Sequence, residues 1–158
     1  MGSKKVNPYD ILRLDNQLCF SLYVCSKEII RMYKPLLEPY KLTYTGYIIL
    51  MALWESDQIT VKDLGKKLYL DSGTLTPLLK KLESIGYIKR NRSQVDERNV
   101  YINLTEKGIG FKKDALRFPE KMVCTLDMDA TSVKELLASL HGMMKHLNNE
   151  ENLENIKQ

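Results

Sequence analysis

Apolar residues recur with helical spacing twice in the middle of the chain, and then with the spacing of a strand. Three of them share one face between positions 61 and 68, which predicts a short helix over 61–68 with Thr60 as its N-cap. Asp71 or Ser72 can open a second helix, and Gly86 can end it. Its apolar stripe follows the i, i+3, i+4, i+7 pattern and consists of Leu75, Leu78, Leu79 and Leu82.

The residues after Gly86 change to a period of two. Tyr87–Arg92 and Asn99–Asn103 each alternate apolar and polar residues, and the polar segment Ser93–Arg98 separates them. This arrangement predicts a β-hairpin. A helix, a turn, a second helix and a hairpin together predict a winged helix-turn-helix.

Helices are predicted on both sides of this motif. One should run from about Leu12 to Tyr33, and a second, Tyr44 to about Glu55, is apolar nearly all round and should be buried. Residues 105–123 predict a long helix that Pro119 kinks or breaks. An amphipathic last helix is predicted over about 130–147.

The fold class is therefore mainly α with a small β wing, in a single domain over residues 1–158. The winged helix-turn-helix covers about 44–104, and the helices at about 10–38 and 105–147 are predicted to form a dimerisation region. A two-fold dimer is favoured because two recognition helices on a symmetric DNA site multiply affinity. The alternative is that the outer helices only cap the core of a monomer.

Positive charge is concentrated in the winged segment. Residues 59–104 hold 9 Lys/Arg against 5 Asp/Glu, whereas the rest of the chain holds 15 of each. Such a surface suits a DNA major groove for the helix and a minor groove or phosphate for the hairpin, although a solvated basic face is the simpler alternative. The candidate contacts are Gly73, Thr76, Pro77, Lys80, Lys81, Arg90, Arg92 and Arg98.

Composition indicates an ordinary cytoplasmic protein, with no membrane partner. The longest apolar run, Tyr47–Trp54, is too short to span a bilayer, and the N-terminus has no apolar signal core. Three cysteines without paired spacing argue against a structural disulfide framework, and they form no zinc pattern with the two histidines. We therefore expect reduced thiols and no metal or cofactor.

Two cysteines lie on the first predicted helix in different surroundings. Cys25 shares a stripe with aliphatic residues and is expected to be a small core residue. Cys19 lies within about 40° of Tyr23 and Tyr33 around the helix axis, at 100° per residue, and phenols can donate hydrogen bonds to a sulfur anion. On the residues alone, an inert buried Cys19 remains the simpler interpretation.

Several motifs together resemble the MarR family of winged-helix transcription regulators, and within it the organic-hydroperoxide-sensing, OhrR-like branch. The similarity covers about Asn16 to Gly108. Its most specific pieces are Asn16-Gln-Leu-Cys-Phe20, Tyr33-Lys-Pro-Leu-Leu37, Leu42-Thr-Tyr-Thr-Gly-Tyr47, the segment from Leu70 to Glu83, and Asp96-Glu-Arg98.

The resemblance implies a dimeric repressor that leaves an inverted-repeat operator when a cysteine is oxidised by an organic hydroperoxide. It places the reactive cysteine at Cys19 and its hydrogen-bonding tyrosines at Tyr33 and Tyr44, with Tyr23 nearby. By position, it makes Cys124 a candidate resolving cysteine from the partner subunit. The resemblance also places the recognition helix at Ser72–Glu83, which adds Ser72 and Thr74 to the candidate DNA contacts. It adds Asp96 as the residue that braces Arg98.

Three other functions remain open. A regulator of the same family could be released by a small aromatic ligand, with structural cysteines. A thiol peroxidase would use Cys19 catalytically, but no peroxidase-like motif surrounds it, so we do not expect an enzyme. A winged helix used for protein contacts disagrees with the concentrated charge. The operator, the regulated genes, the native oxidant, the resolving thiol and any activating role are not encoded in these patterns.

Overall fold

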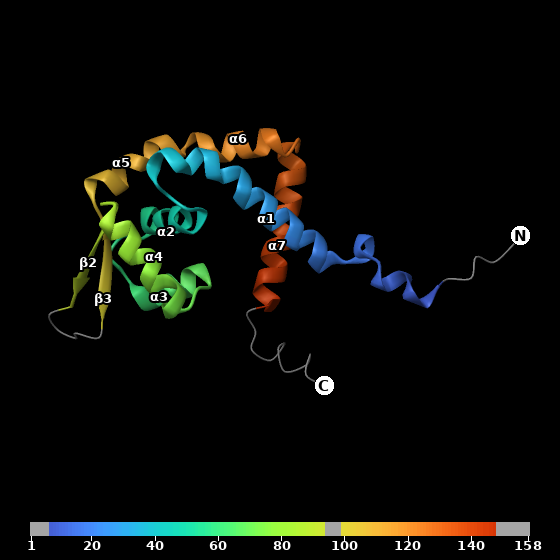
Figure 1. The fold of residues 1–158 in the computed structure, drawn as a ribbon, viewed down its shortest axis with the longest axis horizontal. Coiled ribbons are helices and arrows are strands. Elements are labelled where there is room, and N and C mark those ends of the chain that lie inside the picture. Colours follow the sequence, from blue (N-terminus) through green and yellow to red (C-terminus); the bar gives the residue numbers. More distant parts are fainter. Residues whose placement is uncertain (1–6, 94–98, 148–158) are drawn as a thin grey trace, which may run out of the picture. The chain divides into compact units, whose positions relative to one another are not determined.

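A computed structural model describes residues 7–93 and 99–147 (Figure 1). The chain divides into two compact units, residues 1–116 and residues 117–158, which are described separately. The first unit contains three short 3-10 helices, Pro8–Leu12, Leu14–Asn16 and Glu38–Tyr40. Its other elements are α1 (Leu18–Leu37), α2 (Tyr44–Glu55), β1 (Ile59–Thr60), α3 (Val61–Leu68), α4 (Ser72–Ser84), β2 (Ile88–Arg92), β3 (Val100–Leu104) and α5 (Glu106–Ala115). The second unit contains α6 (Arg117–Thr125) and α7 (Ala130–Leu147).

Helix α2 is the centre of the first unit, as its uniformly apolar sequence predicts. Thr43 caps it by accepting a hydrogen bond from the Gly46 amide at 3.1 Å. The helix packs against α1, α3, α4 and α5, so apolar side chains are buried on several of its faces. Its buried residues are Gly46, Tyr47, Ile49, Leu50, Ala52 and Leu53.

Helices α3 and α4 form the predicted helix-turn-helix. The Thr60 hydroxyl accepts the Asp63 amide at 3.1 Å, and the Asp71 carboxylate accepts the Thr74 amide at 2.9 Å, so both predicted caps are present. The intervening turn places backbone against backbone. A Cβ on Gly65 would lie 2.7 Å from the Leu70 carbonyl oxygen, so only glycine fits there.

The sheet has three strands, where the sequence predicted a two-stranded hairpin. Its order is β1-β3-β2, and all pairs are antiparallel. Strand β1 has only two residues, with Ile59 opposite Ile102, which is too short to show a period of two. The predicted pairing of β2 with β3 is confirmed, with Arg90 opposite Ile102.

The structure refines the two helices that were predicted over about 12–33 and 105–123. Helix α1 starts at Leu18, because the side chains of Asn16 and Gln17 bond the carbonyl oxygens of Asp10 and Ile11 and hold the preceding residues in 3-10 turns. The predicted break near Pro119 is confirmed, because α5 ends at Ala115 and α6 begins at Arg117. In a continuous helix the ring of Pro119 would clash with the carbonyl of Ala115, four residues earlier.

The outermost helices bury very little. Leu37 is the single buried residue of α1, and α7 has none, although its bounds were predicted correctly. Large apolar side chains are exposed on both, including Leu18, Tyr23, Leu136, Leu137 and Leu147. Within residues 7–93 and 99–147, no helix combines the length and apolar character needed to span a membrane.

Candidate functional site

Helix α4 presents a polar and cationic face, as its period predicts. Leu75, Leu79 and Leu82 are buried beneath it, and Leu78 is half-buried. The helix packs on α2, α3 and β2, which fixes the direction of the opposite face. The exposed residues are Ser72, Gly73, Thr74, Thr76, Pro77, Lys80 and Lys81. This geometry suits a recognition helix, and contact of these residues with DNA stays a prediction.

The start of α4 is held by a carboxylate. Asp71 accepts the Thr74 amide at 2.9 Å and the Thr74 hydroxyl at 2.7 Å. These hydrogen bonds, the hydroxyl first, lower the pKa of Asp71 below its ordinary value. The carboxylate therefore stays ionised at the positive end of the helix dipole and stabilises the first turn.

The described part of the hairpin contains one exposed arginine and one arginine that is bound to a carboxylate. Arg92 at the end of β2 is exposed. Arg90 instead bonds Glu83 of α4: its Nε and Nη2 lie 2.7 and 2.6 Å from Oε2, and its amide donates to Oε1 at 3.0 Å. Asp96 and Arg98 lie outside the described residues, so their predicted roles are not addressed by the structure.

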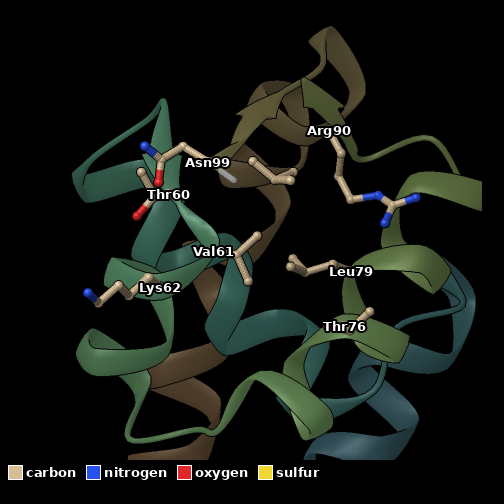
Figure 2. Close-up of a pocket in the computed structure, with 8 residues that line it drawn as sticks. Thr60, Val61, Lys62, Thr76, Leu79, Arg90 and Asn99 are labelled. Atoms are coloured by element: carbon tan, nitrogen blue, oxygen red, sulfur yellow. The ribbon is translucent and has the colours of Figure 1, made fainter. Parts of the chain in front are cut away.

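A cavity of about 250 Å³ opens between α3, α4 and the wing. Figure 2 shows Val61 and Leu79 facing each other across it, with Lys62 and Thr60 on one side and Arg90 on the other. Thr76, Asn99 and Val100 complete the lining. The lining combines apolar side chains with two cations, of which Arg90 is paired with Glu83, so Lys62 is the lining cation that could bind the carboxylate of a small organic anion.

Cys19 lies exposed near the start of α1. Tyr23 is one turn further along and 63% exposed, and the Lys27 Nζ lies 5.7 Å from its ring centroid. Tyr33 is 14 residues from Cys19 on the same helix, a distance of about 21 Å at 1.5 Å per residue. The phenol of Tyr33 therefore cannot reach Cys19 of its own chain.

The predicted tyrosines Tyr33 and Tyr44 do lie together, with ring centroids 4.9 Å apart. Tyr47 joins them, 5.7 Å from Tyr33. Tyr47 was not among the predicted site residues, although it lies three residues after Tyr44 on the same helix face. Burial first, then Tyr47 and Tyr44, raises the pKa of Tyr33 to about 12, so its hydroxyl remains a hydrogen-bond donor at neutral pH.

The other two cysteines are also exposed thiols. The prediction that Cys25 is a core residue is wrong: the thiol is exposed, and its neighbours Leu22 and Ile29 on the same stripe of α1 are only half-buried. Cys124 lies on α6 in the second unit. The role of each cysteine in oxidation stays a prediction.

Comparisons with known proteins agree with the motifs. The profile of a family described as transcriptional regulator SarA/Rot matches residues 31–115. The organic hydroperoxide resistance transcriptional regulator of Bacillus subtilis is 44% identical over 141 residues, which cover 89% of this chain and 96% of that protein.

Solved structures of other proteins share the fold. A structure of reduced AbfR bound to DNA is 34% identical, covers 89% of this chain and 99% of that one, and has a TM-score of 0.73. AbfR of Staphylococcus epidermidis is also represented by a disulfide-containing form, with a TM-score of 0.61 over 85% of this chain and 95% of that one. A MarR structure at 19% identity shows the common fold, with a TM-score of 0.72 and coverage of 82% and 96%.

Proposed function

The chain belongs to the SarA/Rot family of MarR-like transcriptional regulators, and from this premise we propose that it is a DNA-binding repressor released by oxidation of Cys19. The signal is an organic hydroperoxide, as the name of the Bacillus subtilis relative suggests. The protein is a regulator and not an enzyme, in keeping with the family. Since it acts on DNA, the proposal places it in the cytoplasm.

The outward face of α4 is the observation that carries DNA binding. Hydroxyl groups and lysines cover that face, while its opposite side is anchored in the core. The whole segment 59–104 has a net charge of +4. A helix with this surface fits a major groove, and the exposed Arg92 continues the cationic surface onto the wing.

A homodimer supplies the rest of the site. The apolar faces of α1 and α7 are not buried within the chain, and a second copy would cover them. A partner is also needed chemically, because Tyr33 lies about 21 Å from Cys19 along its own helix. We propose that the tyrosines of one protomer donate hydrogen bonds to the Cys19 thiolate of the other.

Oxidation at this site follows ordinary thiol chemistry. The Cys19 thiolate attacks one peroxide oxygen, the O–O bond breaks, and a sulfenic acid and an alkoxide form; the alkoxide takes a proton and leaves as an alcohol. The Cys124 thiol of the partner then attacks the sulfenic sulfur, which forms a disulfide and releases water. Exposure of both thiols permits this step. Helix movement on cross-linking would spoil the spacing of the two recognition helices.

A peroxide titration of operator binding tests this proposal. The chain's own upstream DNA is the probe, with wild type, Cys19→Ser, Cys124→Ser and Cys25→Ser as the matched set. We expect cumene hydroperoxide to release wild type and Cys25→Ser, and dithiothreitol to restore binding. Cys19→Ser should stay bound, and Cys124→Ser should form no cross-linked dimer on non-reducing gels. Equal release of Cys19→Ser would contradict the assignment of the sensor.

The cavity between α3, α4 and the wing favours a second candidate function. A small aromatic acid in it could place its ring against Val61 and Leu79 and its carboxylate near Lys62. Binding there could displace DNA without any oxidation. Release of the Cys19→Ser variant by such an acid under reducing conditions would support this alternative.

A further inference from the structure

Arg90 and Glu83 join the wing to the recognition helix through one carboxylate. Glu83 lies in the last turn of α4, and Arg90 lies in the middle of β2, which is an outer strand of the sheet. The guanidinium donates from Nε and Nη2 to Oε2, and the Arg90 amide donates to Oε1 at 3.0 Å. The amide contact also satisfies a backbone donor on the open edge of the sheet.

We propose that Glu83, acting through Arg90, is a positioning residue that sets the angle of the wing against α4 and so the fit of both to DNA. The inference rests on the proposed DNA-binding function. It changes the role expected for Arg90, which the sequence analysis counted among the cations that contact DNA directly.

The base of the hairpin is already fixed by other contacts. Gly86 has a positive φ of 81°, and its carbonyl accepts the Thr105 hydroxyl at 2.6 Å. The Tyr87 carbonyl accepts the Thr105 amide at 3.0 Å. Arg90 lies three residues after Tyr87. Its bond to Glu83 therefore controls the direction in which β2 continues away from the fixed base of the hairpin.

The state of Glu83 supports the same role. Hydrogen bonding from Arg90, the largest cause, lowers the pKa of the Glu83 carboxyl below its ordinary value of 4.5. It is therefore ionised at neutral pH, and its charge offsets that of Arg90. A guanidinium bound in this way has less charge to offer a phosphate than the exposed Arg92 or Lys80.

The two roles of Arg90 predict opposite effects of one substitution. Glu83→Gln removes a negative charge beside the DNA surface and frees Arg90, so a direct DNA contact would become stronger. If Glu83 positions the wing, the same change weakens operator binding by about fivefold or more, the low end for loss of one groove contact. Arg90→Lys keeps the charge and loses the two-pronged geometry, so it should weaken binding as well.

The test measures operator affinity at fixed salt for wild type, Glu83→Gln, Arg90→Lys, Arg90→Ala and the double variant Glu83→Gln/Arg90→Ala. The double variant should bind the operator no more weakly than Glu83→Gln alone or Arg90→Ala alone, because each single substitution already removes the same interaction. Hydroxyl-radical footprints should lose protection at the outer, wing-contacted positions and keep it in the region under α4. Glu106→Gln, an exposed acid on α5, controls for the charge change and should stay within twofold of wild type.

The proposal would be overturned if Glu83→Gln bound the operator as tightly as wild type or more tightly. It would also be overturned if Arg90→Lys kept the affinity of wild type. Residual dipolar couplings of the DNA-free protein provide a separate measurement: β2 and β3 should rotate relative to α4 in Glu83→Gln and not in Glu106→Gln. Unchanged couplings would also overturn it. Failure of wild type to bind any upstream DNA would instead count against the proposed function, and the couplings would still decide the positioning role.

Discussion

Helices α2 and α7 are both rich in apolar residues, yet they have opposite surroundings. Six of the 12 residues of α2 are buried, whereas none of the 18 residues of α7 is. In α2 the apolar residues surround the helix, and neighbours from its own chain cover them. In α7 they form one face, and Leu136, Leu137 and Leu147 are between 47% and 63% exposed.

This difference separates what one chain completes from what needs a second copy. The winged region has its own core, so its recognition surface is formed within a protomer. The outer helices leave apolar surface for a partner, and α1 carries Cys19 on that surface. Oxidation at such a surface can change how two finished DNA-binding units are spaced, without unfolding either of them.

The largest effect is expected in the core of the winged region. Leu50→Ala removes a fully buried side chain from α2 and should lower the free energy of unfolding by about 2–5 kcal/mol. The neighbouring Met51 is 39% exposed, so Met51→Ala should cost less. Urea denaturation of both variants measures the difference, and equal costs would show that α2 is not the centre of the core.

The second effect concerns the partner surface. Leu137→Glu places a charge on the exposed apolar face of α7, and we expect the dimer to dissociate at micromolar concentration while the far-UV spectrum is retained. Analytical ultracentrifugation measures the change. Tyr69→Asn, at an exposed residue with a φ of 55°, is the control and should remain dimeric. A dimeric Leu137→Glu protein would place the interface elsewhere.

A smaller effect should follow loss of a helix cap. Thr60→Ala removes the acceptor for the Asp63 amide at the start of α3 and should cost about 1 kcal/mol of stability. Because the cap lies within the first unit, the cost should not depend on protein concentration. Thermal unfolding at several concentrations checks this, and a loss of stability that varies with concentration would contradict it.

The smallest effect is a dependence on acid. Glu83 has a lowered pKa in the folded protein, so its contribution is present above its ordinary value of 4.5 and is lost as the pH falls through the folded value. The difference in free energy of unfolding between wild type and Glu83→Gln should therefore be constant near neutral pH. It should shrink as the pH falls below about 4.5. A difference that persists at lower pH would mean that the carboxylate charge is not responsible.

Periodicity predicted most of the fold, because α2, α3, α4 and α7 each carry a clear apolar pattern, and α2, α3 and α4 also begin at a cap residue. It could not predict β1, since two residues show no period, nor the engagement of Arg90, since an arginine in a basic strand has no sequence sign of its partner. The error at Cys25 has a different cause. A helix stripe marks one apolar face of a helix, but it does not say whether another element of the same chain covers that face.

Mixed dimers provide a direct test of whether the thiol of one protomer and the tyrosines of the other form one sensing site. One dimer pairs Cys19→Ser with Tyr33→Phe, so its single remaining Cys19 faces an intact Tyr33 only if the site crosses the interface. The other pairs wild type with the Cys19→Ser/Tyr33→Phe double variant. Stopped-flow oxidation by cumene hydroperoxide should be as fast as wild type, per thiol, in the first dimer and slower in the second. The reverse order would mean that Cys19 is activated by Tyr33 of its own chain, and it would rule out a sensing site shared between protomers.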